Sequence, residues 1–534
     1  MKALSGLDAT FLYLETAETP MHIGSLCLYE LPPGFEGSFH RAVRDHIARR
    51  THLAPIFHRR LAFVPFDLGH PFWVEAGDIA LDRHIRKVPG TQLSVRAVEA
   101  MSARLHGELI DRERPLWVFH IFDSVRRPDG SRCAAMYSKI HHAALDGKGG
   151  TVLANAILDL GPTPRSVPPP DAPSAGAGDL KVGKLLGAVF SNSLAQYAKL
   201  ARSLPAAAGS IGSTVARRSV GELSQGGSAK MPLKLAPRSL FNAGITAERS
   251  FATASLPFAD CKTMARAVGG SFNDVVLWLC STALRTFLAR RSALPDASLV
   301  AAMPVSLRAD GNQELNNQAS ISLVELGTQL GDPLRRMQAI MASTGKVKQA
   351  LVDLKSVLPT DYPSLLAPWL VGGAARLAFK AYGKSGLADR LPMVANLAIS
   401  NVPGPPVPLY LAGARMLSFH PLSIVTHGLA LNITIQTYAG QVDFGLIADR
   451  KAVPDVQELA DGLLQAFGEA RALFDSTDRA AAPPAARKAR VRAVRAPAAQ
   501  PAADSRTARP RARARKAATV AGSSTTQKQK ARRA

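Results

Sequence analysis

Residues 134–147 read AAMYSKIHHAALDG, and this stretch decides the fold that we expect. Most of residues 134–140 are apolar or aromatic, which predicts a buried β-strand. The strand pattern ends at two adjacent histidines, and the Asp-Gly pair behind them is typical of a turn. The stretch therefore predicts a strand that carries two imidazoles at its end, with a tight turn directly after them.

The second histidine of the pair, His142, is the candidate general base. Histidine has a pKa near neutrality, so it can take a proton from an alcohol and give it to a leaving group. A carboxylate at Asp146 would brace the loop or pair with a cation. Gly147 and the glycines after it allow the backbone to approach a ligand closely. A polar loop without a catalytic role is the alternative that the spacing alone leaves open.

Other site chemistries have little support in this chain. Adjacent histidines on a strand point in different directions, and no third ligand has the spacing of a tetrahedral zinc site. Lys148 stands among glycines but lacks the GxxxxGK[ST] frame of a phosphate-binding loop. The cysteines have no CxxC spacing, so they predict neither a zinc site nor a disulfide framework, and a reducing compartment fits them. They are Cys27, Cys133, Cys261 and Cys280.

Strand and helix patterns are mixed on both sides of this stretch, which predicts an α/β (α+β) fold. We divide the folded part into an N-terminal block, residues 1–165, and a C-terminal block, residues 246–475. The expected strands are 22–30, 134–140 and 298–305, with a hairpin over 430–448 that turns at Ala439-Gly440, and the expected helices are 39–50, 94–110, 272–290 and 333–356.

The connector, residues 166–245, contains a loop rich in Pro, Ala and Gly. Within it, residues 180–202 have the pattern of a basic amphipathic helix, which would either pack across the two blocks or lie on an anionic membrane. Charged residues make up 20% of the chain, below the usual ~25%, which suits a protein that handles apolar matter.

The C-terminal tail, residues 476–534, is rich in Ala, Pro, Arg and Lys. Its residues 479–534 hold 16 Lys and Arg against one acid, so they carry +15 of the net charge of +24. With so few apolar side chains we expect this tail to be disordered. It would bind anionic lipid or nucleic acid non-specifically, or it would merely be solvated.

We expect neither a signal peptide nor a transmembrane helix. The uncharged stretch 391–414 contains Pro403, Pro405, Pro406 and Pro408, and the stretch 416–442 alternates like strands. The expected location is cytoplasmic, with peripheral contact to the inner membrane face or to lipid inclusions.

The HHAALDG sequence fits the HHxxxDG motif of the chloramphenicol-acetyltransferase-like superfamily. More specific blocks accompany it in chain order, and with them residues 4–450 resemble the bacterial wax ester synthase/diacylglycerol acyltransferase family. One departure is Asn316, where that family usually has glycine. The blocks are Leu4-Ser5-Gly6-Leu7-Asp8 with Phe11-Leu12, Glu15-Thr16, Pro20-Met21-His22, Pro115-Leu116-Trp117, Asn273-Asp274, Pro304-Val305-Ser306-Leu307-Arg308 and Ser400-Asn401-Val402-Pro403-Gly404-Pro405.

The resemblance implies two chloramphenicol-acetyltransferase-like domains around a central tunnel. It implies that a long-chain acyl group passes directly from acyl-CoA to diacylglycerol or a fatty alcohol, with no cofactor and no metal. His142 would be the base, His141 would support its loop, and Gly147 would keep the tunnel wall open. Asp146 would be structural, with Arg308 as its expected partner.

The remaining motif residues have two interpretations each. Pro115, Leu116 and Trp117 would shape an acyl channel or pack in the core. Asn273 and Asp274 open the helix 272–290, where such residues act as caps. Asn401 would face the reacting centre or form a turn.

Two other functions stay open. The first is acyl transfer to another hydroxyl compound, such as a glycolipid or a polyketide. The second is a non-catalytic lipid-inclusion or nucleoid-associated protein that uses the basic tail.

Overall fold

The computed structural model describes residues 2–64, 70–145, 149–169, 235–306, 319–355 and 393–481. Several expected features lie outside these residues, so the structure says nothing of them. They are Asp146, Gly147, Arg308, Asn316, the predicted helix 180–202 and the tail from residue 482 onward.

The first of two large β-sheets has seven strands, in the order β13-β14-β2-β8-β7-β5, and β6 pairs with β7. Its strands are β2 (His22–Glu30), β5 (Ile85–Lys87), β6 (Leu93–Ser94), β7 (Trp117–Arg126), β8 (Arg132–His141), β13 (Tyr410–Leu411) and β14 (Ala414–Leu422). A small sheet, β1-β4-β3, stands beside it and contains β1 (Lys2–Ala3), β3 (Arg59–Ala62) and β4 (Phe72–Glu75).

The second large sheet has six strands, in the order β11-β10-β12-β15-β16-β9. These strands are β9 (Arg249–Pro257), β10 (Val300–Ser306), β11 (Ala319–Glu325), β12 (Leu397–Val402), β15 (Leu431–Tyr438) and β16 (Gln441–Asp449).

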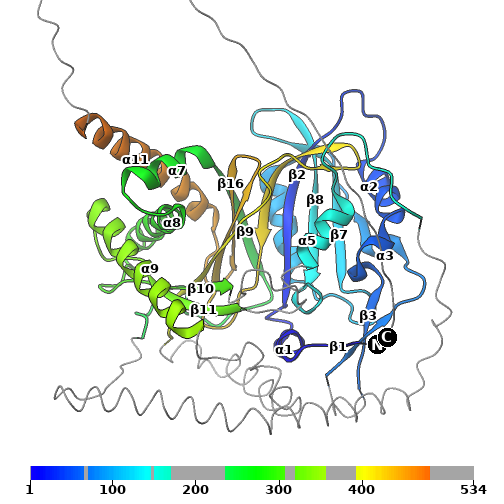
Figure 1. The fold of residues 1–534 in the computed structure, drawn as a ribbon, viewed down its shortest axis with the longest axis horizontal. Helices are drawn as coiled ribbons and strands as arrows, with labels where there is room; N and C mark the ends of the chain where they lie inside the picture. The colour runs from blue at the N-terminus through cyan, green and yellow to red at the C-terminus, as the bar shows by residue number, and fades with distance from the viewer. Residues whose placement is uncertain are drawn as a thin grey trace, which may run out of the picture. The chain divides into compact units, whose positions relative to one another are not determined.

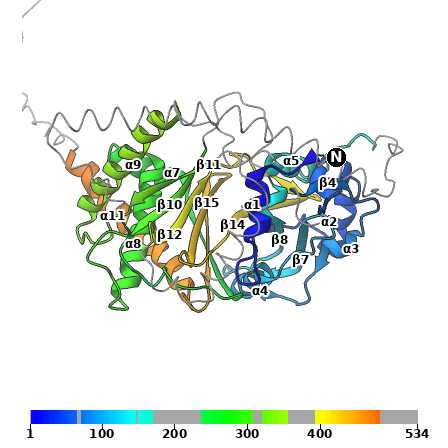
Figure 2. The same cartoon turned by 90° about the horizontal axis from the view of Figure 1, so that it is seen from below.

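Several helices cover the outer faces of the two large sheets. In Figures 1 and 2, α7, α8, α9 and α11 lie on the side of the second sheet that faces away from the first, and α2 and α3 lie beyond the first sheet. The α-helices are α1 (Gly6–Leu14), α2 (Phe39–Ala48), α3 (Leu81–His84), α4 (Val95–Gly107), α5 (Gly149–Ile157), α7 (Phe258–Ala267), α8 (Phe272–Ala289), α9 (Pro333–Lys355) and α11 (Gln457–Ala481). The 3-10 turns are η1 (Thr51–Leu53), η2 (Pro55–Phe57) and η4 (His142–Ala144).

Most of the predicted elements are confirmed. Strand β2 has the bounds expected from the sequence, and the hairpin β15–β16 turns at Ala439 and Gly440, which both have positive φ. The predicted helix 94–110 is too long, because α4 ends at Gly107. Leu109 lies beyond this end and is 49% exposed.

The strands do not separate into two sheets along the chain as the two blocks of sequence do. Strand β14 lies within residues 246–475, yet it pairs antiparallel with β2 of the first sheet, from Arg415 opposite Glu30 to Leu422 opposite Gly24. Sequence periodicity shows which face of a strand is buried but does not identify its partner. The C-terminal block therefore contributes β13 and β14 to the N-terminal sheet.

The two large sheets come into backbone contact where β14 passes β16. The backbone N–H of Phe419 donates to Oδ2 of Asp443 at 2.7 Å, and Nδ1 of His420 lies 3.2 Å from the carbonyl oxygen of Phe444. At Gly445 a β-carbon would lie only 1.7 Å from the carbonyl oxygen of Pro421. Glycine at this position is therefore required for the two sheets to approach one another.

Within the described residues, no single helix has both the length and the apolar composition to cross a membrane. Helices α7 and α8 meet those two criteria together, but they are bent by 99° at their junction.

We expect Gly445→Ala to destabilise the protein, because the added methyl group must push apart two backbone segments. Overpacking of this kind costs about 1–3 kcal/mol, so the midpoint of thermal unfolding should fall. Gly468→Ala is the matched control, since a β-carbon there meets nothing within 4 Å. In the interior of α11 that change should stabilise by about 0.5–1 kcal/mol. Equal midpoints for the two variants would contradict the close approach of the sheets.

Candidate active site

His142 stands where β8 ends and the short turn η4 begins. Its backbone N–H donates to the carbonyl oxygen of Met21 at 2.8 Å. Its imidazole stacks on the ring of Phe11, with 3.9 Å between ring centroids and 15° between planes. Because Phe11 belongs to α1, a side chain from the N-terminal part of the chain covers one face of the His142 ring.

The imidazole of His142 is held in its neutral form. Burial lowers its pKa to about 4, and a contact with the residue's own backbone only partly opposes this shift. Among the described residues, the buried Nδ1 atom has no hydrogen-bond partner. At neutral pH the ring therefore carries a free lone pair, which a general base needs.

His141 has a different environment, because its side chain is fully buried. Its Nδ1 accepts a hydrogen bond from the backbone N–H of Ala143 at 3.1 Å, so the ring's proton must be on Nε2. Nε2 in turn lies 3.2 Å from Oε2 of Glu15. The backbone N–H of His141 donates to the carbonyl oxygen of Leu116 at 3.0 Å. These contacts confine the first histidine of the pair to the interior, where it supports the loop.

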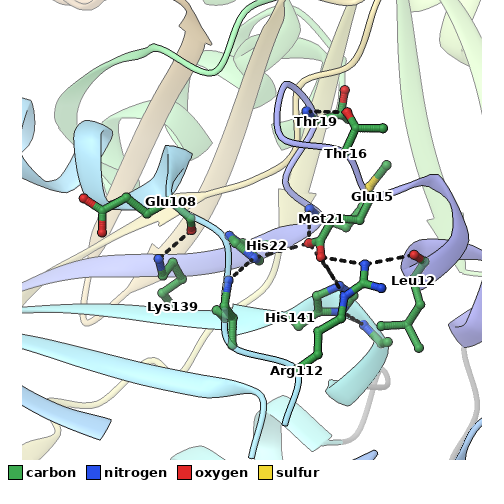
Figure 3. A network of polar contacts seen from close by, with 12 residues as sticks. Leu12, Glu15, Thr16, Thr19, Met21, His22, Glu108, Arg112, Lys139 and His141 are labelled. Carbon is green, nitrogen blue, oxygen red and sulfur yellow. Dashed lines mark hydrogen bonds and ion pairs between the residues drawn. The ribbon is translucent and has the colours of Figure 1, made fainter. Parts of the chain in front are cut away.

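Glu15 is the centre of a buried polar network (Figure 3). Its Oε1 accepts from Nε and Nη2 of Arg112 at 3.0 and 2.7 Å, and its Oε2 accepts from the backbone N–H of Met21 at 3.0 Å. Burial alone would raise the pKa of Glu15, but its contacts with His141 and His22 outweigh burial and hold that pKa well below the usual range. The side chain is therefore a carboxylate, although it is almost completely buried.

His22 lies beside Glu15 in the same network. It pairs in register with His141 across β2 and β8, and its Nε2 lies 3.4 Å from Oε2 of Glu15. Burial lowers the pKa of His22 to about 4. Further along β8, the ammonium group of Lys139 donates to the carbonyl oxygens of Leu105 and Glu108 at 2.7 and 2.8 Å. Burial lowers the pKa of Lys139 to about 8.

The PLW residues lie directly beside the histidine pair. Leu116 packs in a small buried cluster that includes Ala143, and Pro115 is also buried. Trp117 is fully buried, stacks on His84 at 4.4 Å between ring centroids, and donates from Nε1 to the carbonyl oxygen of Phe57 at 3.3 Å. The contacts of Trp117 are those of a core residue.

Two motifs far apart in the sequence meet at the second sheet. Nδ2 of Asn401, on β12, donates to Oδ1 of Asn273, in the first turn of α8, at 3.3 Å. Asp274 closes a capping box with Ser271, and its Oδ1 accepts from the hydroxyl of Thr344 at 2.7 Å. Ser271 is therefore the N-cap of α8, and Asp274 supports the start of the helix as the N3 residue of the capping box.

The described residues contain no group of three or more His, Cys, Asp or Glu side chains that could hold a metal ion. Phe11 and Glu15 contact the histidine pair, and Arg112 contacts Glu15, although none of the three was expected as a site residue. Glu15 and Phe11 belong to the family sequence blocks given above, but the sequence did not predict their contacts with the histidine pair. Nothing in the sequence pattern pointed to Arg112.

Comparisons with known proteins cover almost the whole described part. Residues 4–276 match the family model for the wax ester synthase/diacylglycerol acyltransferase catalytic domain. Residues 315–471 match the model for the C-terminal domain of the same family.

Two relatives show the extent of the similarity. A probable diacylglycerol O-acyltransferase of Mycobacterium tuberculosis is 34% identical over 471 residues, which cover 85% of this chain and 95% of that protein. The O-acyltransferase WSD of Acinetobacter baylyi is 31% identical over 480 residues, which cover 86% and 94% of the two chains.

A solved structure agrees with the fold. The wax ester synthase/diacylglycerol acyltransferase of Marinobacter aquaeolei is 28% identical, with a TM-score of 0.62, and the similarity covers 89% of this chain and 100% of that chain. This confirms the expected mixed α/β fold with two acyltransferase-like domains. The chain is therefore an acyltransferase that belongs to the wax ester synthase/diacylglycerol acyltransferase family.

Proposed function

We propose that this chain transfers a long-chain acyl group from acyl-CoA to the hydroxyl of diacylglycerol or of a fatty alcohol, with His142 as the general base. The observation that carries the proposal is the neutral imidazole of His142, fixed at the end of β8 between Phe11 and the backbone of Met21. The names of the relatives support these two classes of acceptor.

The reaction is a single displacement at the thioester carbonyl. His142 takes the proton of the acceptor hydroxyl while the oxygen attacks the carbonyl carbon. The carbon–sulfur bond then breaks, and the proton on His142 passes to the sulfur. The products are an oxygen ester and free CoA thiol, so the proposed reaction balances without a cofactor or a metal.

The cysteines support direct transfer over a covalent acyl-enzyme. All four thiols are buried, and burial raises their pKa values to about 11 or 12. A thiol must ionise to become an effective nucleophile, so these four side chains are poor candidates for an acyl carrier.

Other parts of the proposal rest on the resemblance. Asp146 would hold the loop, with Arg308 as its partner, and Gly147 would leave room for substrate. Asn401 would face the reacting centre from the second sheet, and Asn273, which accepts its hydrogen bond, would support it there. Since both classes of acceptor are apolar, we also propose that the protein works at the surface of a membrane or lipid inclusion, aided by the basic residues 479–534.

Replacement of His142 by alanine should abolish most of the transfer. A positioned general base contributes roughly 10²–10⁴-fold to rate, so kcat should fall by that factor. The assay is release of CoA thiol from palmitoyl-CoA, with hexadecanol or dioleoylglycerol as acceptor. His58→Ala is the matched control, because the imidazole of His58 faces Glu75 of the small sheet and its loss should leave kcat unchanged. Full activity in His142→Ala would exclude this residue as the base.

On the acid side, kcat/KM should begin to fall only at an unusually low pH. His142 accepts a proton only when neutral, so activity should be retained as pH falls and be lost only as pH passes through about 4. An unperturbed histidine would instead lose activity near its ordinary pKa of ~6.5. Circular dichroism over the same pH range separates loss of activity from loss of fold. A limb near 6.5 in folded protein would contradict the buried, neutral base.

A further inference from the structure

Two chains of polar contacts run from one carboxylate oxygen of Glu15 to the backbone N–H groups of His142 and Ala143. The first passes through a side chain: Nε2 of His141 faces Oε2 at 3.2 Å, and Nδ1 of the same ring accepts the N–H of Ala143 at 3.1 Å. It ends on the residue that follows His142. Because Nδ1 accepts a hydrogen bond, the ring proton is on Nε2, the nitrogen that lies near Oε2 of Glu15.

The second chain passes through a peptide. Oε2 of Glu15 accepts the N–H of Met21 at 3.0 Å, and the carbonyl oxygen of Met21 accepts the N–H of His142 at 2.8 Å. It therefore ends on the candidate base itself. The two chains share one oxygen atom, and Figure 3 shows Glu15 between Met21 and His141.

The geometry points to Glu15 as the positioning residue of this active site: its carboxylate fixes the tautomer of His141 and, through His141 and Met21, the orientation of His142. This inference rests on the proposed function, because it assigns a role to the residues that hold the proposed base. Glu15 contacts neither substrate nor reacting atoms in this account, so it is not a catalytic residue.

Arg112 explains why a buried carboxylate can perform this role. A buried charge is costly unless it is paired and hydrogen-bonded, and Arg112 pairs with the other oxygen, Oε1, through two N–H groups. The same guanidinium donates to the carbonyl oxygen of Leu12, at the end of the helix that carries Phe11. With its charge balanced in this way, Oε2 of Glu15 serves mainly as a hydrogen-bond acceptor.

An isosteric substitution separates acceptance of hydrogen bonds from packing. In Glu15→Gln one carboxylate oxygen becomes an NH₂ group, which can only donate. If the NH₂ group faces His141 and Met21, it meets two donors, and if it faces Arg112, it meets the guanidinium N–H groups. We expect kcat to fall by roughly 10–100-fold, a part of the ~10²–10⁴-fold that a positioned base supplies. KM for palmitoyl-CoA should change little, because no substrate contact is lost.

The matched control is Asp123→Asn. Asp123 also lies in the first sheet and accepts two hydrogen bonds at 2.7 Å, from the hydroxyl of Ser38 and the backbone N–H of His40. These partners lie at the start of α2, so the change disturbs a similar network without touching the histidine pair. Its kcat should stay close to that of the wild type, and a loss as large as that of Glu15→Gln would overturn the inference.

A double-mutant cycle with His141→Gln tests whether Glu15 acts through His141. Residues that act as one unit give strongly non-additive effects. The double variant Glu15→Gln/His141→Gln should therefore lose much less kcat than the product of the two single losses, since only the path through Met21 still depends on Glu15 when His141 is replaced. If the two losses in kcat multiply, Glu15 acts independently of His141 and the inference is wrong.

Nitrogen-15 NMR of histidine-labelled full-length protein tests the tautomer without any turnover. The signal that disappears in His141→Gln belongs to His141, and in the wild type at pH 7 it should show a protonated Nε2 and an unprotonated Nδ1. In Glu15→Gln this preference should be reduced or reversed. A wild-type His141 with its proton on Nδ1 would overturn the inference, even if Glu15→Gln failed to fold.

These outcomes are distinct from those that test the proposed function. A wild-type protein that releases no CoA with either acceptor would remove the proposed reaction, while the NMR result would still judge the tautomer. A wild-type protein with full activity and a Glu15→Gln variant of equal kcat would remove the role of Glu15 alone.

Discussion

The antiparallel pairing of β14 with β2 is the interaction on which the rest of the structure depends. On its other side, β2 pairs with β8, which ends at His141, so a strand from the C-terminal block lies two strands from the candidate base. The same β14 meets β16 of the second sheet at Gly445, where only glycine allows the backbones to approach. The pairing therefore joins both sheets into one unit and fixes the position of β8 within it.

The N-terminal segment, residues 11–22, contacts both histidines of the pair at the end of β8. It supplies the ring that stacks on His142, the carboxylate that faces His141 and the carbonyl that binds the backbone of His142. The second half of the molecule also holds this segment, because the guanidinium of Arg249 donates to the carbonyl oxygen of Glu18 at 2.5 Å. The second half of the molecule therefore contacts the same segment that surrounds the base.

Local features of the fold could be predicted from sequence, and non-local ones could not. The bounds of β2 and the turn of the β15–β16 hairpin follow from residue patterns within a few positions. His142 could be predicted because a strand pattern and a motif coincide there. The pairing of β14 with β2 of the first sheet could not be predicted, because periodicity does not identify a partner strand.

The candidate site shows the same limit. Glu15 and Arg112 are 97 residues apart, and their contact depends on the folded arrangement of α1 and the loop before β7. The contact between Asn273 and Asn401 spans 128 residues, and only their shared family pattern connected them beforehand. Sequence therefore predicted the residue to which we assign the proposed chemistry, but it did not predict the contacts of Glu15 and Arg112.

The most direct test of this account is a crystal structure of the protein with a non-transferable thioether analogue of palmitoyl-CoA and hexadecanol. The account predicts that the hexadecanol oxygen lies within about 2.6–3.2 Å of a ring nitrogen of His142. The carbon that replaces the thioester carbonyl should lie next to that oxygen on its other side. An acceptor hydroxyl that binds away from His142, beside a different side chain able to take its proton, would contradict the account.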